Sequence, residues 1–272
     1  DGGLYAELIE NRDFEYSTDD HGREQNWTAT HSWTLQGNGT RFTISTAQPL
    51  STNQKHYAVL ETESPGAALV NDGFDGIPLH KGEHYDVSLF ARQLAGKASR
   101  IKVQLLDADR VVGEATLAAP SAAWKQLSAT IVAKADATSA SLAIVPTAAG
   151  SLALDFVSLF PQKTFKNRKN GMRADLAQTL ADLHPRFMRF PGGCLVHGDG
   201  LGNMYHWKET IGPLHERKPL RNIWGYHQTR GLGYYEFFQL CEDMGAEPLP
   251  VVAAAVPCQN SAVDPVLGGG QQ

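Results

Sequence analysis

MRADLAQTLADLHPRFMRFPGGC, residues 172–194, predicts a helix, then a short strand, then a tight turn. Leu176, Leu180 and Leu183 recur at helical spacing, and the strand-like run RFMRF stops at Pro191 and two glycines. Glycines let the main chain come close to another molecule without interference from a Cβ atom. The turn is therefore a place where something can approach the backbone closely.

The residues that follow continue the alternation of helix and strand. A second apolar stripe recurs at helical spacing from Phe237 to Met244, and Gly245 follows as the expected C-cap. EPLPVVAAA at 247–255 is almost wholly apolar, as expected of a parallel strand covered on both faces. This order predicts an α/β fold. In a (β/α)8 barrel the chemistry gathers at the C-terminal ends of the strands, which is where the glycine turn lies.

The first half of the chain carries a different pattern, with short alternating runs between turn residues. YDVSLFA at 85–91 places every second residue on one apolar face, and IKVQLL at 101–106 does the same. LALDFVSLF follows at 152–160, and glycine-containing turns such as 37–39 and 71–73 separate the runs. Short strands at this spacing predict an antiparallel sandwich rather than βαβ units.

Charge and cysteine content exclude several classes of function. The net charge is −5, with 24 basic and 29 acidic side chains, whereas a nucleic-acid partner requires a basic surface. No apolar run approaches the roughly 20 residues of a membrane span, so we expect neither nucleic acid nor membrane as a partner. Cys194, Cys241 and Cys258 have no close pair, which makes a poor disulfide framework and favours packed thiols.

Three segments together resemble a known family. They are DGGLYAELIENRDFEY at 1–16, the 172–194 stretch, and YHWKETIGPLHERK at 205–218 followed by EFFQLCEDMGAEPLPVV at 236–252. In this order they resemble the α-L-arabinofuranosidases of glycoside hydrolase family 51, in the subgroup with a β-sandwich between the first barrel strand and the first barrel helix. That sandwich is similar to carbohydrate-binding modules of the family 4/9 type.

The resemblance implies a multidomain fold of β and α/β parts. An antiparallel β-sandwich of the jelly-roll, galactose-binding-like kind is inserted in a partial (β/α)8 TIM barrel. We expect an N-terminal barrel segment at 1–13, the sandwich at 14–160 and the partial barrel at 161–272. A whole barrel needs about 250 residues, so we also expect exposed strand edges that favour self-association.

The family's chemistry needs two glutamates. The resemblance implies a retaining mechanism, in which an acid/base and a nucleophile about 5–5.5 Å apart form and hydrolyse a covalent glycosyl-enzyme. The family's acid/base lies in an Asn-Glu pair, and this sequence contains no such dipeptide. We expect both catalytic glutamates to lie outside this sequence, which then has no catalytic residue and no turnover. Glu209, Glu216, Asp243 and Glu247 are interpreted as structural or surface charges.

The resemblance also assigns sugar contacts. Gly192, Gly193 and Cys194 match the turn under the sugar subsite, and Trp207 matches an aromatic residue, in W-x3-IGP, that can stack on a sugar face. The alternative is an ordinary turn, a packed thiol and a core aromatic. Arg189 is expected either to orient a carboxylate or to form a buried ion pair.

Two further sites are expected in the sandwich. Trp27 and Trp33 lie in the polar stretch QNWTATHSW and are predicted to be exposed and to bind sugar. Glu15 and Asp155 match places where such modules hold a structural Ca²⁺. Two side chains fall short of the six to eight oxygens that calcium takes, so backbone carbonyls would complete the site. We expect no other cofactor.

Two classes of function remain open from the sequence. The first is part of a retaining α-L-arabinofuranosidase that acts on terminal arabinofuranosyl residues of arabinan or arabinoxylan, with an arabinose-containing oligo- or polysaccharide as its partner. The alternative is a carbohydrate-binding or purely structural β-sandwich module without catalysis. Polysaccharide substrates favour a periplasmic or extracellular location over a cytoplasmic one.

Overall fold

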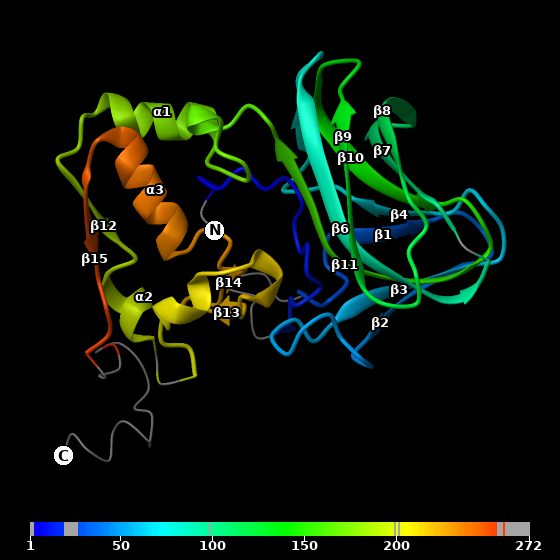
Figure 1. Cartoon of the computed structure of the whole chain (residues 1–272), viewed down its shortest axis with the longest axis horizontal. Coiled ribbons are helices and arrows are strands. Elements are labelled where there is room, and N and C mark those ends of the chain that lie inside the picture. Colours follow the sequence, from blue (N-terminus) through cyan, green and yellow to red (C-terminus); the bar gives the residue numbers. More distant parts are fainter. Residues whose placement is uncertain are drawn as a thin grey trace. The chain divides into compact units, whose positions relative to one another are not determined.

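The computed structural model describes residues 3–18, 27–97, 99–198, 200, 202–254 and 258. It divides into two compact units, each considered by itself (Figure 1). The sandwich unit comprises Ala6–Tyr16 and Thr28–Asn170, and the barrel-like unit comprises the described parts of 1–5, 17–27 and 171–272. The expected combination of a β-sandwich with a partial α/β unit is confirmed.

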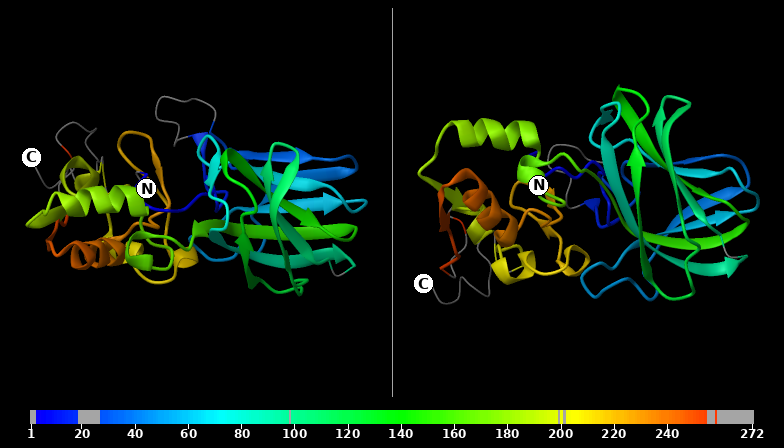
Figure 2. Two further views of the ribbon diagram at one scale, coloured as in Figure 1. Left: turned by 90° about the horizontal axis from the view of Figure 1, so that it is seen from above. Right: turned by 45° about the horizontal axis from the view of Figure 1, so that its top comes forward.

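The sandwich unit consists of two antiparallel sheets, which Figure 2 shows as facing layers. The first has the order β1-β4-β10-β7-β8, with β5 paired to β10, and the second has the order β2-β3-β11-β6-β9. The strands of the first sheet are β1 (Trp33–Gln36), β4 (Ala68–Asn71), β5 (Ile77–Leu79), β7 (Ile101–Asp107), β8 (Arg110–Leu117) and β10 (Ala137–Pro146). Those of the second are β2 (Thr40–Ser45), β3 (Tyr57–Thr62), β6 (His84–Gly96), β9 (Lys125–Val132) and β11 (Gly150–Pro161).

The core of this unit follows the predicted alternation. Tyr85, Val87, Leu89 and Ala91 of β6 are all buried in the main apolar cluster. Strand β11 lies between β3 and β6 and is buried at nearly every position, which explains its almost continuous apolar sequence.

The boundary between the units differs from the expected one. The 1–13 segment was expected to belong to the barrel, but from Ala6 onward it packs on the sandwich. The Leu8 N–H donates to the Leu159 carbonyl at 3.0 Å, and the Leu159 N–H donates to Glu7 Oε1 at 2.9 Å. Arg12 pairs with the buried carboxylate of Glu7 at 3.1 Å. Burial raises the pKa of Glu7, and the charge of Arg12 opposes that shift.

The same polar contacts explain why the segment belongs to the sandwich. They satisfy backbone groups at the end of β11 that would otherwise be buried without partners. Residues 161–170, expected in the barrel, also belong to the sandwich unit.

Trp33 contradicts the prediction that it is exposed and binds sugar. It begins β1, is 5% exposed, and lies in the main core cluster beside Phe14 at a ring-centroid distance of 5.1 Å. Its indole N–H donates to the Asn11 carbonyl at 2.9 Å. The polar neighbours of Trp33 misled the prediction, because alternate residues of a strand face opposite sides.

The barrel-like unit is built around two parallel strands. Phe187 pairs with Glu247 and Phe190 with Pro250, and α3 lies beside both strands (Figure 1). Gly245 caps α3 in the left-handed conformation with φ +69°, as predicted. The elements are α1 (Ala174–Asp182), β12 (Phe187–Phe190), α2 (Gly193–His197), η3 (Trp207–Thr210), η4 (Leu214–Glu216), β13 (Leu220–Arg221), β14 (His227–Gln228), α3 (Tyr234–Met244) and β15 (Glu247–Pro250), with η2 (Phe165–Asn167) in the sandwich unit.

The apolar faces of this unit are less covered than the sequence suggested. All four residues of β15 are exposed, whereas burial on both faces was expected. Leu183 and Phe187 are exposed as well. The leucines of α1 that were predicted to face the core are not buried, and the buried residue of this helix is Ala177. The expectation of self-association stays a prediction. Among the described residues, none of the helices is both long and apolar enough to cross a membrane.

The burial of Trp33 generates the first test. The substitution Trp33→Ala removes a large core side chain and its hydrogen bond to the Asn11 carbonyl, so we expect it to destabilise the sandwich unit by about 3–5 kcal/mol. Urea unfolding followed by far-UV circular dichroism measures this effect. Phe74→Ala, at an exposed aromatic of the same unit, serves as the control and should change stability by less than about 0.5 kcal/mol. Equal stability of the two variants would contradict the buried position.

Candidate functional site

The glycine turn after β12 has a separate reason for each glycine. Gly192 and Gly193 have φ of +71° and +57°, which side-chain-bearing residues rarely adopt. A Cβ on Gly192 would lie 2.7 Å from Nε of Arg189, so the first glycine accommodates this chain's own guanidinium. A Cβ on Gly193 would meet nothing within 4 Å. The second glycine therefore faces open space, where a ligand can approach the backbone.

Arg189 itself is exposed on β12, and among the described residues it forms no ion pair. The alternative of a buried ion pair is therefore wrong. Cys194 follows the turn and is half-buried. The neighbouring thiol of Cys258 is the main cause that raises the pKa of Cys194. Cys194 is therefore neither a core thiol nor an isolated one.

An aromatic stack connects the turn with Trp207. Phe190, the last residue of β12, contacts the ring of Tyr234 edge-on at 5.4 Å. The Tyr234 ring lies nearly parallel to that of Trp207, with centroids 5.9 Å apart and planes at 12°. Tyr234 is buried, whereas Trp207 is 39% exposed at the end of the stack. The structure thus brings Trp207 and the glycine turn together through Tyr234, which the sequence analysis missed.

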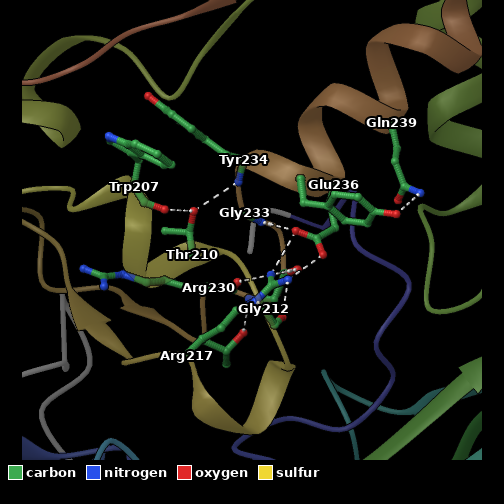
Figure 3. A network of polar contacts seen from close by, with 12 residues as sticks. Trp207, Thr210, Gly212, Arg217, Arg230, Gly233, Tyr234, Glu236 and Gln239 are labelled. Atoms are coloured by element: carbon green, nitrogen blue, oxygen red, sulfur yellow. Dashed lines mark hydrogen bonds and ion pairs between the residues drawn. The ribbon is translucent and has the colours of Figure 1, made fainter.

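Thr210 joins the two aromatic residues through their backbones (Figure 3). Its hydroxyl donates to the Trp207 carbonyl at 2.8 Å and accepts from the Tyr234 N–H at 3.1 Å. A Cβ on Gly233 would lie only 2.0 Å from the Thr210 carbonyl oxygen, so this position requires glycine. The η3 turn and the first turn of α3 are therefore fixed against each other.

A buried ion pair connects Arg217, which follows η4, to the first turn of α3 (Figure 3). Arg217 contacts Glu236 with both terminal nitrogens, at 2.9 and 2.8 Å, and its side chain is 3% exposed. Glu236 also accepts from the Gly233 N–H at 2.9 Å at the beginning of α3. Arg217 also donates to the carbonyls of Gly212, Arg230 and Gly231.

Arg217 is buried and pairs with a carboxylate on a distant element. Its partner Glu236 lies in the first turn of α3, three residues after Gly233, the position at which a carboxylate caps a helix. That spacing is the one signal in the sequence that pointed to Glu236. Glu209, interpreted as a structural charge, pairs with Arg230, which is buried.

This arrangement positions groups rather than transferring protons. Glu236 and Glu209 are each held by an arginine, and the carboxylate of Glu236 is fully engaged by Arg217 and Gly233. The features that face outward are the ring of Trp207 and the open side of Gly193. An exposed aromatic face suits the apolar C–H surface of a sugar ring, and an unobstructed backbone allows close approach of a ligand.

A second aromatic cluster lies on the sandwich unit. Arg92 lies over the rings of Tyr57 and Trp124, at 5.3 and 5.0 Å from their centroids. It donates to the Tyr57 hydroxyl at 2.9 Å, and the Trp124 indole N–H donates to the Gln48 carbonyl at 3.1 Å. Its neighbour Ala91 belongs to the core cluster, so Arg92 lies on the outer face of the second sheet. Trp124 is half-buried rather than part of the core.

Acidic side chains meet inside the sandwich unit. Asp155 is fully buried, and burial followed by the charge of Asp13 raises its pKa well above the ordinary value. Oδ1 of Asp155 accepts from the Phe156 N–H at 2.7 Å, whereas Oδ2 and both carboxylate oxygens of Asp13 are buried without a hydrogen-bond partner. Glu15 instead accepts from the His56 N–H and pairs with its ring, both at 2.7 Å. The unpaired oxygens therefore belong to Asp13 and Asp155, and the expected metal site at Glu15 and Asp155 stays a prediction.

These orphaned oxygens fit a hard cation, because buried carboxylates are normally paired or bound to metal. Three or more His, Cys, Asp or Glu side chains do not come together as a metal site anywhere in the described part of the chain. Backbone carbonyls would have to supply most of the ligands.

Comparison with known proteins identifies both units. A model described as "Carbohydrate binding domain" matches residues 6–150, which is more than half of the chain. The chain belongs to this carbohydrate binding domain family. A second model, "Alpha-L-arabinofuranosidase 1 domain", matches residues 179–266.

Relatives support the same assignment over nearly the whole chain. The chain is 43% identical to an extracellular exo-α-L-arabinofuranosidase of Streptomyces chartreusis over 97% of its length, and 33% identical to α-L-arabinofuranosidase 1 of Arabidopsis thaliana over 91%. It covers only 32% and 37% of those proteins. An arabinose-bound α-L-arabinofuranosidase of glycoside hydrolase family 51 has a similar structure, with TM-score 0.85 and 32% identity over 97% of this chain and 43% of that one. The expected resemblance is confirmed.

The matched ranges place the candidate sites. The arabinofuranosidase match includes the glycine turn, Trp207 and the Arg217–Glu236 pair. The carbohydrate binding domain contains Trp33 and the Arg92 cluster, and β11 completes its second sheet although the match ends at residue 150. Trp27, expected to bind sugar in the sandwich, is half-buried and belongs to the barrel-like unit.

The ion pair generates the second test. Glu236→Gln leaves the buried guanidinium of Arg217 without its counter-charge, so we expect a loss of about 3–5 kcal/mol in the barrel-like unit. Hydrogen exchange at the Tyr234 amide should accelerate, because the first turn of α3 loses its hold on Thr210. Glu242→Gln, on an exposed position of the same helix, is the control. Similar exchange rates in both variants would show that the pair does not fix this turn.

Proposed function

We propose that the chain is the sugar-recognising part of a retaining α-L-arabinofuranosidase, which releases terminal arabinofuranosyl residues from plant polysaccharides such as arabinan and arabinoxylan. The catalytic glutamates of that enzyme would lie on segments outside this sequence. The observation that carries the proposal is the exposed Trp207 ring, which stacks on Tyr234, while Tyr234 in turn contacts Phe190 just before the glycine turn. Similarity to an arabinose-bound arabinofuranosidase supports it.

In this proposal some residues contact the sugar and others hold those residues in position. The exposed face of Trp207 packs on the furanose ring, and the turn Gly192–Cys194 provides backbone next to the sugar. Arg217, Glu236 and Thr210 hold Trp207 in position and do not touch the substrate. Trp27 stays a candidate sugar contact. The similarity to an extracellular enzyme favours an exported protein.

A second function is favoured by the family of the sandwich unit. We propose that the carbohydrate binding domain holds polysaccharide on the outer face of the second sheet at Trp124, the half-buried ring of this cluster, because the buried Arg92 and Tyr57 fix its position. If the sandwich is purely structural, substitutions in this cluster will not change the affinity for sugar.

Sugar binding by Trp207 is testable by isothermal titration with arabino-oligosaccharides. Trp207→Ala should weaken binding roughly tenfold, because an aromatic face contributes about 0.5–1.5 kcal/mol beyond area burial. Trp224→Ala removes another exposed tryptophan of the same unit and should leave binding unchanged. The chain should not hydrolyse nitrophenyl arabinofuranoside. Hydrolysis that a single substitution within the chain abolishes would contradict the proposed location of the catalytic glutamates.

We also propose that Asp13 and Asp155 hold a structural Ca²⁺ through their unpaired oxygens, with backbone carbonyls completing the site. When bound, the ion would neutralise two carboxylates that otherwise repel each other inside the sandwich.

The pH dependence of stability tests this site. The pKa of Asp155 is higher in the folded state than in the unfolded state. The free energy of unfolding therefore falls as the pH rises from about 4, the unfolded pKa, through the raised pKa of the folded state. With chelator at pH 7, Asp155→Asn should therefore be at least as stable as the wild type, and the difference should vanish below about pH 4. Added Ca²⁺ should stabilise the wild type and not the variant.

The exposed substitution Asp109→Asn serves as the control and should respond to Ca²⁺ as the wild type does. A wild-type melting temperature that is equal in chelator and in Ca²⁺ would refute the metal site while leaving the raised pKa standing.

A further inference from the structure

Two of the three cysteines meet at the edge of the candidate subsite. Cys194 begins the turn of α2 that follows the glycines, and Cys258 lies eight residues beyond the end of β15. The Gly198 N–H donates to the Cys194 carbonyl at 2.9 Å, and the Cys258 N–H donates to the Gly198 carbonyl at 3.0 Å. One glycine is therefore hydrogen-bonded to the backbones of both cysteines and holds them near each other.

The third cysteine is in a different environment. Cys241 is buried in α3 within the cluster of Phe190, Tyr205 and Tyr234. Cys194 is half-buried and Cys258 is almost fully buried. This difference suits the two roles in thiol exchange, in which an accessible thiolate attacks a disulfide from solution and a sheltered neighbour completes the reaction. Because Gly198 holds both cysteine backbones, we expect the disulfide to form without large movement of the backbone.

We propose that Cys194 and Cys258 form a redox-active pair that closes to a disulfide by exchange with a small-molecule disulfide such as oxidised glutathione. The Cys194 thiolate attacks one sulfur of the oxidant, a bond forms between them, and one glutathione thiolate leaves. The Cys258 thiolate then attacks the Cys194 sulfur and displaces the second glutathione. Two protein thiols are oxidised, one disulfide is reduced to two thiols, and both protons pass to solvent or to the glutathione thiolates.

The bond would act on the two parallel strands of the barrel-like unit. Cys194 follows the end of β12 and Cys258 follows the end of β15, and these strands are neighbours in register. The disulfide would fasten the segment after β15 to the turn after β12. It would also remove the Cys194 thiol from the side of the turn assigned to sugar. Disulfides persist in oxidising surroundings, which agrees with the proposed export. The pairing of the thiols does not depend on the proposed sugar function.

The test uses the full chain without substitution. After complete reduction, the chain is equilibrated with oxidised glutathione, its remaining thiols are alkylated, and its intact mass and peptides are measured. We expect the mass to fall by two hydrogen atoms, one thiol to be alkylated at Cys241, and the peptides that contain Cys194 and Cys258 to be linked. Three alkylated thiols at equilibrium, or a bond that involves Cys241, would overturn the proposal.

Variants separate the two roles. Cys258→Ser should retain one glutathione on Cys194, because the displacing thiol is missing. Cys241→Ser should form the disulfide as the wild type does. A wild type that retains glutathione at Cys194 as Cys258→Ser does would also overturn the proposal. Titration of the oxidised and reduced chains with arabino-oligosaccharide is a separate measurement, and failure of both forms to bind would count against the sugar function and not against the disulfide.

Discussion

The candidate site depends on the buried ion pair between Arg217 and Glu236. One guanidinium binds a carboxylate and three backbone carbonyls, which come from two loops that contain no long helix or strand. Irregular backbone of this kind has few hydrogen-bond partners of its own, so a planar donor with five N–H groups replaces a regular element. Glu236 also accepts from the Gly233 N–H and so fixes the beginning of α3. The Thr210 hydroxyl donates to the Trp207 carbonyl and so fixes Trp207.

The sandwich unit uses buried charge differently. Glu7 is buried with Arg12 as its partner and receives backbone N–H groups at the end of β11, so its carboxylate fastens the N-terminal segment to the sheet. Asp13 and Asp155 have no such cation among the described residues. The negative charge of Asp13 instead disfavours the charged form of Asp155. Buried carboxylates are costly unless paired. That contrast within one domain is the physical reason for placing a cation beside Asp13 and Asp155 and not beside Glu7.

Local patterns in the sequence predicted the regular elements and failed where distant residues meet. The alternation of Tyr85, Val87 and Leu89 and the cap at Gly245 are properties of neighbouring residues, and both predictions are confirmed. Trp33 was misjudged because its polar neighbours face the other side of the strand. Arg217 and Glu236 lie 19 positions apart, and no periodic pattern between them would pair them. The proximity of Cys194 and Cys258 depends on the parallel pairing of β12 with β15.

The glycine turn shows how a motif can combine structural and functional constraints. Gly192 is required because the Arg189 guanidinium occupies the place of a side chain, which is a constraint of the fold itself. Gly193 meets no such neighbour, so its backbone strain is not explained by packing. Under the proposed function, the physical reason for glycine at this position is a bound sugar. Glu209 and Glu236 are each held by an arginine, so in that function they position the site rather than transfer protons.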